Sequence, residues 1–286
     1  MISQRFFGHP ESPLFAVYHQ PRGRSKQSGD VRAAVICPSI GQEYNRTHWT
    51  LRLLANQVAR RGVHVLRLDY HGIGDSAENI DQIDSLNVWR SDISPAIEHL
   101  KQKTNANSVM LIGQRFGAAL ASQIACQRLD VNGVVLWEPV TDGKAYLDTL
   151  RQMHATMLDL WVCKMQTPNN ESIEEIVGSQ FQRSLIQEIE AFRLQLDQVV
   201  QPQLIIDTPQ RHELYWHSEP GTQLLIEEAR ASSWHELEEC ESAWLRPETL
   251  RTVVNKVVEM FDRLQGFNAL GPLTSTTLTQ TMEATS

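Results

Sequence analysis

The chain has 286 residues, of which 41% are hydrophobic, and this is enough to build the core of one large domain or two small ones. Its formal net charge of −8 gives no support to nucleic acid or an anionic membrane as the main partner. No apolar run approaches the roughly 20 residues needed to span a bilayer, and the first residues do not resemble a signal peptide. We therefore expect a cytoplasmic protein without membrane insertion.

Strands and helices alternate along the first half of the chain. Apolar runs predict strands at 14–19, 33–38, 63–70, 108–113 and 132–139. Helical spacing predicts helices at 47–61, 87–103 and 115–129, with Thr47 as an N-cap, Gly62 as a stop and Pro95 as a kink. This alternation predicts a mostly parallel, doubly wound sheet with helices on both faces.

The second half departs from this alternation. Residues 144–200 are predicted to be almost entirely helical and to form a lid over the ends of the strands. Two strands (203–207 and 223–228) and a last helix (246–264) follow. We therefore divide the chain into a core (1–143 and 201–268), a helical lid insertion (144–200) and a Thr/Ser-rich tail that we expect to be disordered (269–286).

The segment VMLIGQRFGA (109–118) predicts a strand that turns sharply into a helix. Gly113 and Gly117 stand two residues before and two after the centre of this turn, where the chain has no room for side chains. In hydrolases with such an elbow the centre is a serine, held in a strained conformation. Here the centre is Arg115, and the following helix directs its unpaired N–H groups toward the same pocket.

Two further segments carry a resemblance to the α/β-hydrolase superfamily. GVHVLRLDYHGIGDS (62–76) resembles the segment of these enzymes that ends in D-x-x-G-x-G-x-S, and CPSIGQEYN (37–45) occupies the loop after the third strand. The resemblance implies an α/β-hydrolase fold. It also implies an oxyanion site built from the loop of Ser39 and Ile40 and from the N–H of Phe116.

A narrower resemblance rests on GQRFGAALA and LWEPVTDGKAYLDTLR (136–151). These segments resemble the second of two hydrolase-like families that accompany exosortase A gene systems in bacteria that produce exopolysaccharide. In that family an arginine also occupies the elbow centre, and W-x-P-V-x-x-G-K follows the sixth strand. The resemblance implies that Arg115 is a family feature.

Arg115 excludes acyl transfer through an elbow serine, because a guanidinium with a pKa above about 12 is not a nucleophile at working pH. Its forked donors match a carboxylate or phosphate, so one interpretation is a site for an anionic small molecule. The alternative is that Arg115 pairs with a local acid and fills the cleft. The candidates for that acid are Glu138, Asp142 and Asp207.

The acid and base of a catalytic triad have candidates in Asp207, which ends the seventh strand, and His235, which follows the eighth. Together they could activate a water molecule. The alternative is that His235 is an exposed salt-bridge partner among acidic residues.

Two serines, one histidine and one histidine-containing segment are further candidates for function. Ser39 and Ser76 are either displaced nucleophiles or caps of turns. His71 either contacts a ligand or makes ordinary loop hydrogen bonds. The segment RHELYWH, with His212, Glu213 and His217, lacks the H-E-x-x-H spacing of a metal site, so we expect no metal and no cofactor.

The four cysteines form no C-x-x-C pair, and we expect reduced thiols at Cys37, Cys126, Cys163 and Cys240.

Three functions follow from these observations. The first is a catalytically inactive relative that binds an anionic small molecule or a partner protein in exopolysaccharide production. The second is an ester or thioester hydrolase or acyltransferase that uses water activated by His235. The third is a structural subunit whose pocket is filled by its own side chains.

Overall fold

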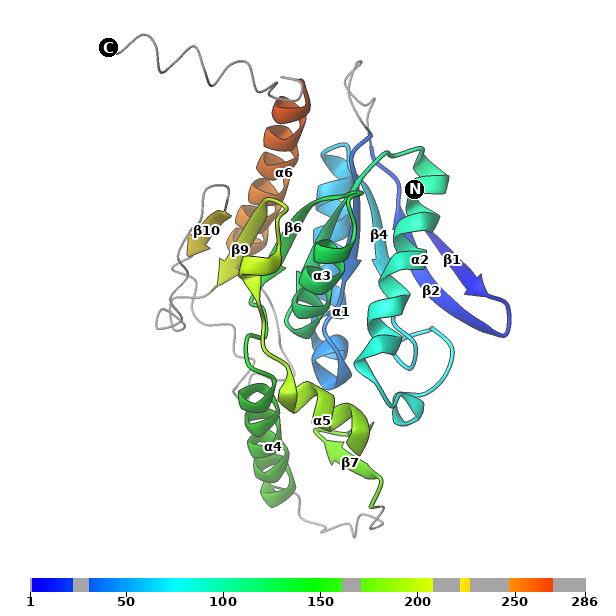
Figure 1. Cartoon of the computed structure of the whole chain (residues 1–286), viewed down its shortest axis with the longest axis vertical. Helices are drawn as coiled ribbons and strands as arrows, with labels where there is room; N and C mark the ends of the chain where they lie inside the picture. The colour runs from blue at the N-terminus through cyan, green and yellow to red at the C-terminus, as the bar shows by residue number, and fades with distance from the viewer. Residues whose placement is uncertain (1, 23–30, 161–170, 208–221, 227–246, 270–286) are drawn as a thin grey trace.

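The computed structural model describes residues 2–22, 31–160, 171–207, 222–226 and 247–269. An eight-stranded sheet runs through it in the order β1-β2-β4-β3-β5-β6-β9-β10 (Figure 1). The strands are β1 (Ile2–His9), β2 (Ser12–His19), β3 (Ala33–Cys37), β4 (His64–Leu68), β5 (Val109–Gln114), β6 (Val131–Trp137), β9 (Gln203–Asp207) and β10 (Thr222–Ile226). The pairs β1–β2 and β2–β4 are antiparallel and the others are parallel, so the predicted mostly parallel sheet is confirmed.

Helices cover both faces of this sheet. The helices are α1 (Gly41–Arg60), α2 (Leu86–Thr104), α3 (Phe116–Gln127) and α6 (Pro247–Ala269). Successive residues of the strands divide between two cores: in β5, Leu111 joins the core under α2 and α3, while Met110 and Ile112 join the core under α1 and α6. This is why the strands read as continuous apolar runs in the sequence.

Helix α1 begins six residues before the position that the sequence predicted. Thr47 was expected to cap the helix, but it lies inside α1 and its buried hydroxyl donates to the Glu43 carbonyl at 2.9 Å. The prediction was wrong because Gly41 and Asn45 resemble loop residues, whereas the turn that contains them is stabilised by packing. Gly62 does end this helix, with φ at +91° just after the C-cap Arg61.

The edge strand β1 was not predicted, because its side chains are mostly exposed and give no apolar run. It pairs along its whole length with β2, from Ile2 opposite His19 to His9 opposite Ser12.

The insertion between β6 and β9 is less helical than predicted, because a β-hairpin stands between its two helices where the sequence predicted an almost entirely helical segment. It contains α4 (Gly143–Leu160), the hairpin β7 (Ile173–Ile176)–β8 (Ser179–Gln182), α5 (Arg183–Ala191) and the 3-10 turn η2 (Leu196–Gln198). Figure 1 shows α4, α5 and β7 grouped at one end of the molecule. The hairpin packs against a second 3-10 turn, η1 (Ile80–Gln82), and Phe181 of β8 lies against Gly41. The tail from residue 270 onward lies outside the described residues.

The two elbow glycines lie where no side chain fits. A Cβ on Gly117 would overlap the carbonyl oxygens of Cys37 and Pro38, and one on Gly113 would overlap the backbone of Ala118. The loop after β3 and the first turn of α3 are therefore held in direct backbone contact. This confirms the steric reason for the G-x-x-x-G spacing.

We predict that Gly117→Ala lowers the free energy of unfolding by about 3 kcal/mol, because a methyl group would force the two backbones apart. Helix propensity alone predicts the opposite, a gain of roughly 1 kcal/mol. Urea unfolding followed by circular dichroism measures the change. Gly178→Ala serves as the control, since its Cβ would meet nothing within 4 Å and only its φ of +76° opposes alanine. A Gly117→Ala protein as stable as the unaltered chain would contradict the prediction.

Candidate functional site

The elbow turn holds Arg115 in a conformation that few side-chain-bearing residues adopt. Its φ and ψ are +53° and −123°. The Arg115 N–H donates to the Trp137 carbonyl at 3.0 Å, and the Arg115 carbonyl accepts from the N–H groups of Ala118 and Val140. These bonds to β6, α3 and the segment after β6 fix the backbone, so the strain that the elbow motif predicts is present without a serine.

The side chain of Arg115 is buried and forms an ion pair with Glu43 of α1. Its Nε donates to Glu43 Oε1 at 3.0 Å, and its Nη2 lies 3.0 Å from the same oxygen. Both side chains are 2% exposed. Nη1 donates to the Glu138 carbonyl oxygen at 3.3 Å. The cation at the elbow centre is thus held by an internal carboxylate.

The insertion contributes a third member to this cluster. The Tyr146 hydroxyl, from α4, donates to Glu43 Oε2 at 3.1 Å, and its ring centre lies 5.8 Å from the Arg115 guanidinium carbon. The Phe116 ring packs against Tyr146 at 5.8 Å and against Phe192 at 5.4 Å. Aromatic side chains from the elbow and the insertion therefore enclose the ion pair.

The electrostatics of the cluster keep Arg115 charged. Burial alone would lower the pKa of Arg115, but the negative charges of Glu43 and Glu138 outweigh burial and raise it. Burial, with the Glu43 charge second, raises the pKa of the Tyr146 hydroxyl, so Tyr146 acts as a neutral hydrogen-bond donor.

The sequence named three possible acidic partners for Arg115 and missed Glu43. Glu138 contributes its carbonyl and its charge, whereas Asp142 pairs with Arg193 at 3.2 Å. Asp207 ends β9, but its side chain is not described. Glu43 lies in CPSIGQEYN, which the sequence predicted to be a loop; recognising 41–46 as the first turns of a helix pointing at the elbow would have found it.

The structure brings together the two segments expected to form an oxyanion site. Ile40 directly precedes α1, Phe116 opens α3, and the contact at Gly117 holds their loops side by side. Ser39 is fully buried, and its hydroxyl lies 2.8 Å from the Thr47 hydroxyl, so it braces the loop.

His71 makes structural hydrogen bonds with both ring nitrogens. Nδ1 lies 2.6 Å from Asp92 Oδ1, and Nε2 lies 3.2 Å from the Ser12 carbonyl oxygen. Burial lowers the pKa of His71, but Asp92 outweighs burial and raises it. Of the two alternatives that the sequence offered for His71, ligand contact and ordinary loop hydrogen bonding, this arrangement fits the second.

Ser76 also braces a loop, because its buried hydroxyl donates to the Asp69 carbonyl at 2.6 Å and accepts from the Phe15 N–H at 2.8 Å.

Several candidates fall outside the described residues, among them His235 and the segment with His212, Glu213 and His217. Within the described ranges, no three His, Cys, Asp or Glu side chains gather as metal ligands would. No helix in the described ranges has the length and apolar character required to cross a bilayer. Cys37 and Cys126 are free thiols, while Cys163 and Cys240 lie outside these ranges.

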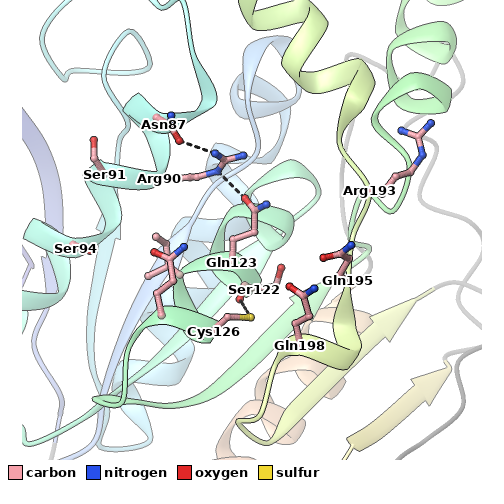
Figure 2. A pocket seen from close by; sticks show the side chains of 12 residues that line it. Asn87, Arg90, Ser91, Ser94, Ser122, Gln123, Cys126, Arg193, Gln195 and Gln198 are labelled. Carbon is pink, nitrogen blue, oxygen red and sulfur yellow. Dashed lines mark hydrogen bonds between the residues drawn. The ribbon is translucent and has the colours of Figure 1, made fainter.

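A polar groove of about 500 Å³ lies between α2, the C-terminal half of α3 and the segment 193–198 (Figure 2). Arg90 there donates to Asn87 at 2.7 Å and to Gln123 at 2.8 Å. Ser122 donates to the Ala119 carbonyl at 2.7 Å. The groove lies at the end of α3 opposite the elbow, and these side chains bond to one another, so we do not take it as the active-site pocket.

The sheet order, the strained elbow and the helix that follows it define an α/β-hydrolase fold. A family model described as serine aminopeptidase, S33, matches residues 32–215, and the chain belongs to this family. In this member Arg115 stands at the elbow centre, where the fold usually carries serine. No curated protein matches the sequence.

Solved structures share the fold at low sequence identity. Est1E of Butyrivibrio proteoclasticus, with ferulic acid bound, aligns with a TM-score of 0.62 and 15% identity over 91% of this chain and 98% of its own. GrgF, an alpha/beta hydrolase of Penicillium sp. sh18, aligns with a TM-score of 0.64 and 14% identity over 93% of this chain and 99% of its own. The Pyrococcus furiosus esterase PF2001 aligns with a TM-score of 0.58 and 12% identity over 93% of this chain and 91% of its own.

We predict that Glu43→Gln lowers the free energy of unfolding by about 3 kcal/mol, because it leaves the buried Arg115 cation without its carboxylate. Chemical denaturation monitored by tryptophan fluorescence gives the value. The matched control is Asp148→Asn, which removes a carboxylate from an exposed pair with Lys144 at 2.6 Å and should cost less than about 1 kcal/mol.

A double variant separates the pair from its surroundings. Glu43→Gln with Arg115→Met should cost less than the sum of the two single changes, since neither then leaves a lone charge. If the loss of unfolding free energy in the double variant equalled the sum of the losses in the two single variants, Arg115 and Glu43 would not be energetically coupled.

Proposed function

We propose that this protein is a catalytically inactive member of its hydrolase family and acts by binding. The observation that carries the proposal is the buried ion pair between Arg115 and Glu43 at the position of the nucleophile. A guanidinium cannot attack a carbonyl carbon, and this one is held by a carboxylate, a backbone carbonyl and an aromatic ring. Serine-type acyl transfer therefore has no group to begin it at the elbow.

The ligand proposed from the sequence was an anionic small molecule or a partner protein. Glu43 neutralises Arg115, so an anion at the elbow must share the guanidinium with this carboxylate. A polar partner group that accepts from the first N–H groups of α3 does not compete with Glu43. The role in exopolysaccharide production depends only on the resemblance carried by the segments 113–121 and 136–151.

A second candidate function is hydrolysis by water activated at His235. The name of one structural neighbour favours it, because PF2001 of Pyrococcus furiosus is an esterase. The elbow backbone of this chain also keeps the strained geometry of a working site. In that case Arg115 would hold an acidic substrate and His235 would act as the general base.

Activity measurements test the proposal. We expect no hydrolysis of p-nitrophenyl esters or acyl thioesters above the rate in buffer. We also expect no covalent labelling by a fluorophosphonate, since that reagent needs an activated serine. Intact-protein mass spectrometry detects the label.

Turnover that disappears in His235→Ala would overturn the proposal and establish the second candidate. Labelling that disappears in Ser39→Ala or Ser76→Ala would instead identify a displaced nucleophile.

A further inference from the structure

A second cavity lies on the α1 face of the sheet, away from the elbow centre. Its volume is about 250 Å³. Phe15, Val17 and His19 of β2 line it together with Arg67 of β4, while His48 and Arg52 of α1 form a wall. Val17 and Arg67 are paired across the β2–β4 ladder, so they stand side by side on this face.

Arg67 is a buried cation, and the carboxylate that acts on it is Asp69: burial lowers the pKa of Arg67, and the Asp69 charge offsets this only in part. Arg67 is 8% exposed, and its Nε donates to His19 Nε2 at 3.2 Å. It forms no ion pair with any described residue, and no described acceptor takes a hydrogen bond from its two terminal nitrogens. Because the Asp69 charge offsets the burial of this cation only in part, the cavity beside Arg67 is suited to an anion.

The acids near Arg67 make other contacts. Asp69 Oδ2 accepts from the Asp75 N–H at 3.2 Å. The Asp69 carboxylate and the Tyr44 hydroxyl both lie against Gly74. Asp69 and Asp75 nevertheless line the cavity, so their charges oppose an anion there and limit its affinity. Burial raises the pKa of Asp69 to about 6, which weakens this opposition in mild acid. His48 and His19 are predominantly neutral near pH 7, because burial lowers the pKa of both.

The rim of the cavity is apolar and exposed. Ile2 lines the cavity and is 47% exposed, and Phe6 is 63% exposed with its ring 5.2 Å from the Phe15 ring. Trp49, which is 50% exposed, lies 5.0 Å from the Arg52 guanidinium carbon. Large exposed apolar side chains beside a cationic floor suit a ligand with one charged end and one apolar end.

We propose that this cavity binds a small monoanionic carboxylate, with its carboxylate on the Arg67 guanidinium and its apolar group against Phe15 and the rim. Arg52 contributes a second positive charge at the entrance. The site is separate from the Arg115 cluster and does not depend on whether the elbow is catalytically inactive.

The test is isothermal titration calorimetry, in which the full chain is titrated with benzoate and, separately, with hexanoate. We expect binding with a dissociation constant on the order of 1 mM for either ligand. Arg67→Gln should weaken binding about tenfold or more, since it removes a charge-assisted hydrogen-bond donor. Arg52→Gln, at an exposed position where folding is not at risk, should weaken binding about threefold.

Arg5→Gln is the matched control, because Arg5 is an exposed cation on β1 whose neighbours Gln4 and Phe6 point to the opposite face. Its affinity should equal that of the unaltered chain. The proposal would be overturned if 10 mM ligand gave no heat of binding. It would also be overturned if Arg52→Gln and Arg67→Gln both bound with the affinity of the unaltered chain, or if neutral benzamide bound as tightly as benzoate. Tighter binding of inorganic phosphate than of benzoate would overturn the assignment to a carboxylate.

Discussion

A buried ion pair between Arg115 and Glu43 joins the turn after β5 to the first turns of α1. Tyr146 extends this contact to the insertion through the second oxygen of the same carboxylate. Three segments that are distant in sequence therefore meet at one desolvated charge pair, and each must keep its position for the charges to stay paired. In a serine hydrolase this place is left open for substrate. Here the ion pair fills it, and the arrangement of the surrounding loops depends on the pair.

Most of the fold follows from local patterns in the sequence. Continuous apolar runs predicted the buried parallel strands, and the spacing of Gly113 and Gly117 predicted an elbow that the backbone contacts explain. The errors lie where tertiary packing replaces local signals. Exposed β1 is held by pairing with β2, α1 extends through a glycine-containing turn, and the β7–β8 hairpin is held against η1 and Gly41. None of these contacts can be recognised from neighbouring residues alone.

The candidate site was predictable in its centre and not in its partners. Arg115 could be placed because the elbow motif fixes the position of its middle residue, and the exclusion of a serine nucleophile there follows from chemistry alone. Glu43 could not, since 72 residues separate the two side chains and only the packing of α1 brings them together. The same limit applies to Arg67, whose surroundings come from β2 and α1. A charged residue within a strand gives no sign of whether its partner is internal or a ligand.

The interdependence of Arg115 and Glu43 has an evolutionary consequence. Substitution of Arg115 by serine alone would leave Glu43 as an unpaired anion among Phe116, Tyr146 and Phe192, so this single step would meet a stability barrier before any serine-based activity arose. Loss of the Glu43 carboxylate first would likewise leave Arg115 as a buried cation without its ion-pair partner. A serine elbow without that penalty requires a change at Glu43 as well, and such paired substitutions are rare, so the ion pair acts against the appearance of a serine nucleophile at the elbow of this chain.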